Sequence, residues 1–110
     1  MLIVAGNADG AANRVYYAMF YAAKAALEVL DPKLTTVKSH ASIIRSFGKR
    51  VVIAYGLDPS LGRAFNAAED FRIAADYERK PIELSEAERL VDDMERFLTA
   101  VAKFLECGAP

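Results

Sequence analysis

The stretch SEAERLVDDMERFLTAVAKFL, residues 85–105, carries the clearest structural pattern in this chain. Large apolar side chains recur every three or four residues, and charged side chains fill most positions between them. This spacing places the apolar residues on one face of an α-helix. Ser85 followed by Glu88 also matches the capping-box pattern of a helix start. We therefore predict an amphipathic helix that begins at Ser85 and packs against other helices.

Three segments upstream show the same helical spacing, at about residues 11–30, 36–55 and 59–80. Gly56 is predicted to end the second of them, and Asp58 with Pro59 to begin the third. No segment has the alternating pattern of a strand. Short connections favour antiparallel neighbours, so we predict an all-α, antiparallel up-and-down bundle of four long helices. The opening MLIVAG is interpreted as the last turn of a truncated or short first helix.

The predicted core consists of the residues on the inner stripes of these helices. A chain of 110 residues with 54% hydrophobic side chains is large enough for one such core, so residues 1–110 are expected to form a single domain. The predicted core residues are Val15, Met19, Ile44, Phe47, Val51, Leu61, Phe65, Ala68, Phe71, Val91, Met94, Phe97, Leu98, Val101 and Leu105.

The charge of the chain is nearly balanced, at −1, with an isoelectric point near 5.8. No global positive field would therefore attract a polyanion, and any phosphate site must be local. The one basic tract is residues 32–57, which lack carboxylates. Lys38, Arg45 and Lys49 share one helical face in this tract, which is either a phosphate-binding face or simply a solvated one.

Other classes of chemistry find little support in the sequence. The single cysteine, Cys107, and the absence of a signal peptide or a membrane-length apolar run favour the cytoplasm. With one histidine in the chain, a histidine-based metal cluster is not expected. A glycine-rich phosphate loop and a CxxC pair are also missing, so we predict neither a metal nor a cofactor.

The most unusual feature of the sequence is Arg72, an arginine within the largely apolar helical stretch EDFRIAADYERKP at residues 69–81. Arg72 borders a face formed by Phe71 and Ala75, where its guanidinium needs water, an ion pair or an anionic ligand. Glu69 and Asp76 lie three residues before and four residues after it, at spacings that allow ion pairs. Arg72 is thus either a salt-bridge residue or a contact for an anion.

Two aromatic features also have structural and functional interpretations. His40 lies on the apolar stripe of the second segment. It is either a hydrogen-bonded residue at the core boundary or a catalytic imidazole. Tyr16, Tyr17 and Tyr21 are expected to pack with their hydroxyls at the bundle surface. Tyr17 and Tyr21 are alternatively spaced for a seam between two subunits.

Three sequence blocks resemble the HEPN family, the nucleotide-binding domains of higher eukaryotes and prokaryotes, and specifically its small stand-alone prokaryotic branch. The first is AANRVYYAMFYAAKAAL at residues 11–27, in which Asn13, Arg14, Tyr16, Tyr17, Ala18 and Phe20 match the pattern. The second is HASIIRSFGK, starting at His40, and the third is RIAADY, starting at Arg72. The blocks occur in family order, and the resemblance covers nearly the whole chain from Ala5 onward.

The resemblance implies a homodimer with a cleft near its two-fold axis. In the ribonucleases of the family, an arginine steadies the phosphate and a histidine, separated from it by four to six intervening residues, moves protons, without a metal. Arg72 matches that arginine, but Tyr77, Glu78 and Arg79 occupy the histidine positions. A phenol is a poor base at neutral pH, so the roughly 10²- to 10⁴-fold contribution of proton transfer is expected to be lost.

The anion-binding half of the site is therefore expected to remain. Arg72 and Arg14 would contact phosphate, Asp76 would orient the guanidinium of Arg72, and Tyr77 would offer a hydroxyl or a ring to the ligand. His40, on the neighbouring helix, is the candidate replacement for the missing imidazole.

The resemblance implies a nucleotide- or RNA-binding module, the partner of a minimal nucleotidyltransferase in a toxin–antitoxin-like system. Tyr77 is a conceivable acceptor for modification by that partner. Two alternatives stay open: a metal-independent endoribonuclease that uses Arg72 with the imidazole of His40, and a non-catalytic dimeric scaffold that binds no nucleotide.

Overall fold

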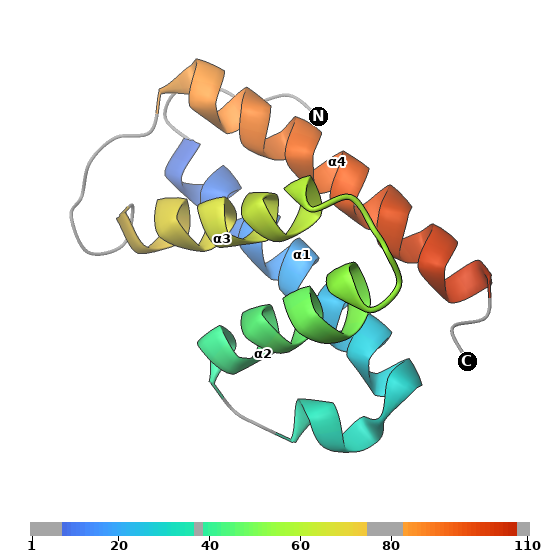
Figure 1. Cartoon of the computed structure of the whole chain (residues 1–110). Coiled ribbons are helices and arrows are strands. Elements are labelled where there is room, and N and C mark those ends of the chain that lie inside the picture. Colours follow the sequence, from blue (N-terminus) through green and yellow to red (C-terminus); the bar gives the residue numbers. More distant parts are fainter. Residues whose placement is uncertain (1–7, 37–38, 75–82, 108–110) are drawn as a thin grey trace.

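The described part of the computed structural model, residues 8–36, 39–74 and 83–107, consists of helices and short connections (Figure 1). It contains no strand, which confirms the predicted all-α class. The predicted last turn of a short first helix, in residues 1–6, lies outside this part. The elements are α1 (Ala8–Leu30), the 3₁₀ helix η2 (Pro32–Thr35), α2 (His40–Phe47), the π-helix η3 (Gly48–Ile53), α3 (Ser60–Ile73) and α4 (Leu84–Glu106).

Helix α1 occupies the centre of the bundle and contacts α2, α3 and α4 (Figure 1). Because neighbours cover it on several sides, it is buried along two stripes rather than one. The predicted stripe includes Val15 and Met19, and a second includes Tyr16 and Leu27, all with at most 1% of their surface exposed. In the described residues, no helix has the length and apolarity that crossing a bilayer requires.

The helices that follow α1 alternate in direction where their connections are short. Helix α3 runs opposite to the α2–η3 segment and to α4 (Figure 1). Between α1 and α2 the chain instead turns back through η2. As a result, His40 begins α2 beside Tyr17 and Phe20, and Ala54, just after η3, lies near Leu30 at the end of α1. This return positions His40 against the middle of the central helix.

The predicted second helix, residues 36–55, is shorter and divided. It begins at His40 because the Ser39 side chain accepts a hydrogen bond from the Ser42 backbone N–H, at 3.4 Å. It then widens into η3. Gly56, with φ of 67°, ends the segment as predicted. Its N–H donates to the carbonyl of Ile53, and that of Leu57 to the carbonyl of Val52, which is the Schellman arrangement of a helix end.

The starts of the last two helices differ slightly from prediction. Helix α3 begins at Ser60, where the Asp58 carboxylate accepts a backbone hydrogen bond at 2.9 Å. This bond holds the pKa of Asp58 below its ordinary value. Helix α4 begins at Leu84, so the predicted capping box at Ser85 is wrong. Glu86 instead accepts a hydrogen bond from the backbone N–H of Glu83. The carboxylates of Asp58 and Glu86 are also stabilised by the partial positive charge at the N-terminus of the helix that each one caps.

Three phenylalanine rings join the helices at the centre of the core. Phe97 of α4 lies 5.1 Å from Phe47 of α2 and 5.3 Å from Phe65 of α3, measured between ring centroids. All three side chains are fully buried. Most of the predicted core is buried, although Phe71, Met94 and Leu98 are only partly covered. The prediction that Leu105 is buried is wrong. Phe104 occupies the buried face at this end of α4, and Leu105, the next residue, is 36% exposed.

We expect Phe97→Ala to lower the free energy of unfolding by about 3–5 kcal/mol, because it removes a buried ring and leaves a cavity. Leu105→Ala, on the same helix but exposed, should cost less than about 1 kcal/mol. Urea denaturation measures both. A loss below about 1 kcal/mol for Phe97→Ala would contradict the described core.

Gly56 supplies a second test of the fold. Gly56→Ala should destabilise the protein by about 1–2 kcal/mol, because an alanine there must adopt the left-handed conformation although its Cβ meets no neighbour. Gly62→Ala is the matched control inside α3, where the Cβ also has open space. It should leave the stability unchanged or raise it by up to about 1 kcal/mol. Equal effects in thermal denaturation would argue against the helix end at Gly56.

Candidate functional site

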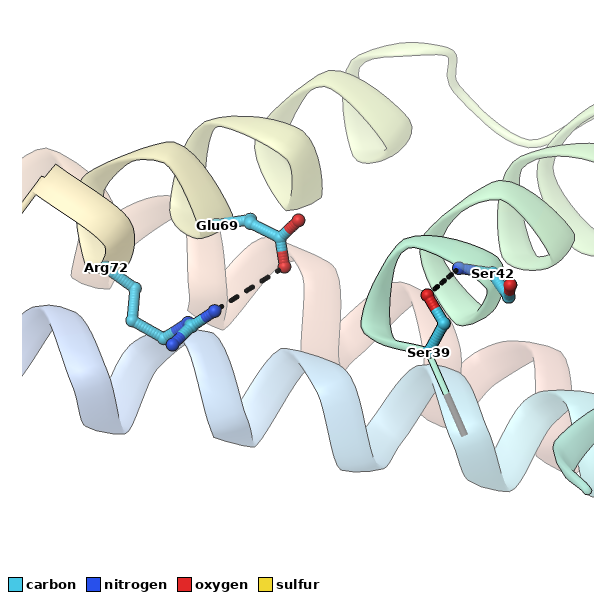
Figure 2. A network of polar contacts seen from close by, with 4 residues as sticks. All are labelled: Ser39, Ser42, Glu69 and Arg72. Atoms are coloured by element: carbon cyan, nitrogen blue, oxygen red, sulfur yellow. Dashed lines mark hydrogen bonds and ion pairs between the residues drawn. The ribbon is translucent and has the colours of Figure 1, made fainter. Parts of the chain in front are cut away.

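Arg72 lies in a polar and aromatic cluster between α1, α2 and α3. We call this the Arg72 cluster; its members are Tyr16, Tyr17, Phe20, His40, Glu69 and Arg72. Figure 2 shows the Arg72 side chain extending from α3 toward α1, with Glu69 one turn earlier on the same helix. The cluster brings together residues from all three sequence blocks that resemble the HEPN family.

The guanidinium of Arg72 lies over the ring of Tyr16. Its Cζ atom is 4.7 Å from the Tyr16 ring centroid and 6.0 Å from that of Tyr17. A cation over an aromatic face gains about 0.5–2 kcal/mol, with the larger values where water is excluded. Because the Arg72 side chain is only 16% exposed, water solvates its guanidinium only in part, and the two rings replace some of the lost solvation.

Glu69 is the acidic neighbour of Arg72. One carboxylate oxygen lies 3.9 Å from a terminal guanidinium nitrogen, at the outer limit of an ion pair (Figure 2). The Glu69 side chain is 19% exposed, so solvent screens this pair less than one on an open surface. The predicted salt bridge to Glu69 is therefore present. The alternative partner, Asp76, lies outside the described residues.

Tyr16 is the deepest member of the cluster and has no exposed surface. The expectation that its hydroxyl reaches the surface is wrong, because that oxygen is buried. Burial raises the pKa of the Tyr16 phenol far above its ordinary value, the Glu69 carboxylate raises it further, and Arg72 opposes the rise. The phenol therefore stays neutral at physiological pH, and its ring provides a fixed surface for the guanidinium.

His40 reaches the same two tyrosines from α2. Its ring lies 4.6 Å from Phe20, 5.6 Å from Tyr16 and 5.8 Å from Tyr17, measured between centroids, and its side chain is half-buried. The Ser39 cap shown in Figure 2 fixes the helix start that carries it. Arg72 and His40, 32 residues apart in the chain, thus both contact Tyr16 and Tyr17.

Two of the predicted phosphate-binding residues line a groove next to the cluster. This groove, about 440 Å³ in volume, lies between the α2–η3 segment and α3. Arg45 and Lys49 are exposed on one side, and Asn66 and Glu69 lie on the other. Glu69 therefore belongs both to the groove and to the cluster, which connects the basic tract with Arg72.

The remaining predicted site residues are not brought into this cluster by the described structure. Arg14 is exposed on α1, and no described residue forms a hydrogen bond or ion pair with it. Lys38, Asp76 and Tyr77 lie outside the described residues. Sequence reasoning missed the role of Tyr16 as a support for Arg72. The available signal was its position on a second helical stripe, four residues before Phe20.

A second groove, of about 570 Å³, separates the start of α3 from the middle of α4. It contains Arg63 and Arg96 but also Asp58 and Asp93, and Arg96 pairs with Asp93. The acidic residues offset the charge of the arginines, so this groove is a poorer site for an anion than the one beside Arg72.

Comparison with known proteins gives the class of this domain. The sequence profile described as HEPN domain matches residues 2–104. The chain belongs to the HEPN domain family.

Three relatives are similar over most of the chain. Two are proteins of Methanocaldococcus jannaschii that carry the name putative toxin; each is 35% identical, over 88% and 87% of this chain and 65% and 69% of their own lengths. A UPF0332 protein of Gloeobacter violaceus is 34% identical, over 88% of this chain and 76% of its own length. The chain thus spans about two thirds to three quarters of these relatives. No solved structure matches significantly.

The buried phenol of Tyr16 predicts a loss of stability at alkaline pH. The folded-state pKa is raised above the unfolded value of about 10, so folding favours the protonated phenol. The resulting stability is present below about pH 10 and is lost as the pH rises above that value. Tyr16→Phe should weaken this dependence between about pH 10 and 11.5, in denaturation followed by circular dichroism. An unchanged dependence would contradict the burial of the hydroxyl.

Proposed function

We propose that this protein is a toxin-type HEPN module that binds RNA through phosphate contacts centred on Arg72. The observation that carries this proposal is the position of the Arg72 guanidinium over Tyr16, beside Tyr17 and close to the groove of Arg45 and Lys49. The HEPN profile match and the names of the two Methanocaldococcus jannaschii relatives support it.

The chemistry of the cluster suits a phosphate group. A guanidinium forms charge-assisted, bidentate hydrogen bonds with phosphate, and its five donors remain fixed in one plane. The Tyr16 ring reduces the freedom of that plane before the ligand arrives, which lowers the entropic cost of binding. Arg45 and Lys49 would contact further phosphates of the same strand along the groove.

The proposed working form is a homodimer that acts with a nucleotidyltransferase partner. The unequal charge of the chain supports self-association: residues 1–57 hold seven basic and three acidic residues, and residues 58–110 seven basic and twelve acidic. Arg14, Lys38, Asp76 and Tyr77 remain candidate ligand contacts in this assembly, and Tyr77 remains a candidate acceptor for the partner.

One observation favours endoribonuclease activity as a second candidate. His40 contacts the same tyrosine pair as Arg72, so an imidazole and a guanidinium adjoin the same two rings. Arg72 would hold the phosphate while His40 takes the proton from the ribose 2′-hydroxyl. The 2′-oxygen would attack the adjacent phosphorus and displace the 5′-oxygen of the next nucleotide, which leaves with a proton from water. No metal is needed for this step.

The proposal predicts a specific effect of Arg72→Ala on RNA binding. The affinity for a labelled, structured RNA should fall roughly 10- to 100-fold, because a hydrogen bond to a charged group contributes about 1.5–3 kcal/mol. The slope of log K against log[salt] should decrease by about one, as expected for one lost phosphate contact. Filter binding in EDTA over a series of salt concentrations measures both. Arg96→Ala, an exposed arginine on α4, is the matched control and should behave as wild type.

The same reactions distinguish the alternatives. Binding without cleavage supports the RNA-binding module, whereas EDTA-resistant cleavage that both Arg72→Ala and His40→Ala abolish supports the ribonuclease. If wild type, Arg72→Ala and His40→Ala retain RNA equally weakly, Arg72 is only a salt-bridge residue and the proposal fails.

A further inference from the structure

Tyr17 and Tyr21 form an aromatic surface on α1 next to Arg72. Their ring centroids are 6.1 Å apart with an angle of 33° between the ring planes. Tyr17 is half-buried, while Tyr21, one turn further along, is 62% exposed. A tyrosine that exposes most of its surface contributes little to the core, so packing does not account for its ring.

Tyr17 is central to the arrangement at the surface. Its ring lies 6.0 Å from the Arg72 guanidinium carbon and 5.8 Å from the His40 ring. Tyr17 thus contacts both Arg72 and His40, and Tyr21, the most exposed of the four residues, adjoins Tyr17. Cationic and aromatic groups therefore adjoin on one face of the protein.

We propose that Tyr17 and Tyr21 are a stacking surface for unpaired RNA bases, while Arg72 contacts the adjoining phosphate. Proteins that bind single strands combine these two elements, because the backbone needs positive charge and every base has a π-face that stacks on aromatic rings. Bases paired within a duplex do not offer this face. The inference rests on the proposed function and narrows its ligand to single-stranded RNA.

The charge of this surface and its place beside the groove favour single-stranded RNA over a protein as its ligand. The face presents a cation beside aromatic rings, and in the adjacent groove the two positive charges of Arg45 and Lys49 exceed the one negative charge of Glu69. A nucleic-acid strand matches both features, since its phosphates and bases alternate along the chain. A protein partner would need to supply both acidic and apolar groups in the same order. Contact between two copies of this chain through Tyr21 is the rival that the experiment must identify.

The test uses a single-stranded RNA of about twelve nucleotides and a charge-matched RNA of the same length that contains abasic residues. Tyr21→Ala should weaken binding of the intact RNA roughly 5- to 100-fold, the range measured when one stacking aromatic is removed. Tyr21→Phe should bind within about twofold of wild type, because the ring remains. Tyr21→Ala should not weaken binding of the abasic RNA, and its salt slope should equal that of wild type because no charge is lost.

Tyr55→Ala is the matched control, since Tyr55 is also an exposed tyrosine but follows η3, at the far end of that segment from His40. It should leave the affinities for the intact and the abasic RNA unchanged.

Equal weakening of intact-RNA and abasic-RNA binding by Tyr21→Ala would overturn the inference. So would sedimentation that shows a wild-type dimer and a Tyr21→Ala monomer. If Arg72→Ala weakens binding and Tyr21→Ala does not, the stacking inference alone fails; if Arg72→Ala has no effect, the proposed function fails.

Discussion

The structure depends on the burial of α1 on several sides at once. A helix on the surface of a bundle buries one stripe, but α1 contacts α2, α3 and α4 and buries two. Its small residues, among them Ala12, Ala23 and Ala26, are fully covered and allow these neighbours to approach closely. Because the second stripe contains Tyr16, the same burial that stabilises the bundle places an aromatic ring against α3.

That placement determines the environment of Arg72. Moving an arginine away from water is costly unless other groups replace the lost solvation. Here the Tyr16 face and the Glu69 carboxylate do so, while 16% of the arginine side chain stays accessible. The result is a guanidinium that is oriented by the fold but still reachable by an anion. His40 shares this environment because the chain returns through η2 before α2 begins.

The fold was predictable from sequence because helix spacing and chain breaks are local properties. Gly56 illustrates this, since a glycine after a helical pattern indicates the helix end wherever the helix packs. Local patterns can also compete: Ser85 with Glu88 and Glu83 with Glu86 are both three residues apart, and the helix uses the second pair. The spacing of Leu105 fits the apolar stripe and so predicts burial, whereas the neighbouring helices leave that side of α4 uncovered.

The candidate site was only partly predictable, because it depends on which helices meet. The pairing of Arg72 with Glu69 follows from a spacing of three residues on one helix. The contacts of Arg72 with Tyr16 and of His40 with Tyr17 join different helices, and no single-helix pattern specifies them. The family resemblance brought the three blocks into one site, but it did not indicate that a buried tyrosine ring would support the arginine.

The most direct test of this account is the side-chain N–H resonance of Arg72 in an NMR titration with single-stranded RNA. In the free protein this resonance should be displaced by the ring current of Tyr16, and Tyr16→Leu should remove the displacement. On addition of RNA it should shift and saturate, while that of Arg96 on α4 should not move. An Arg72 resonance that is insensitive to both Tyr16→Leu and RNA would contradict the central claim that the fold holds this arginine on an aromatic ring as an anion site.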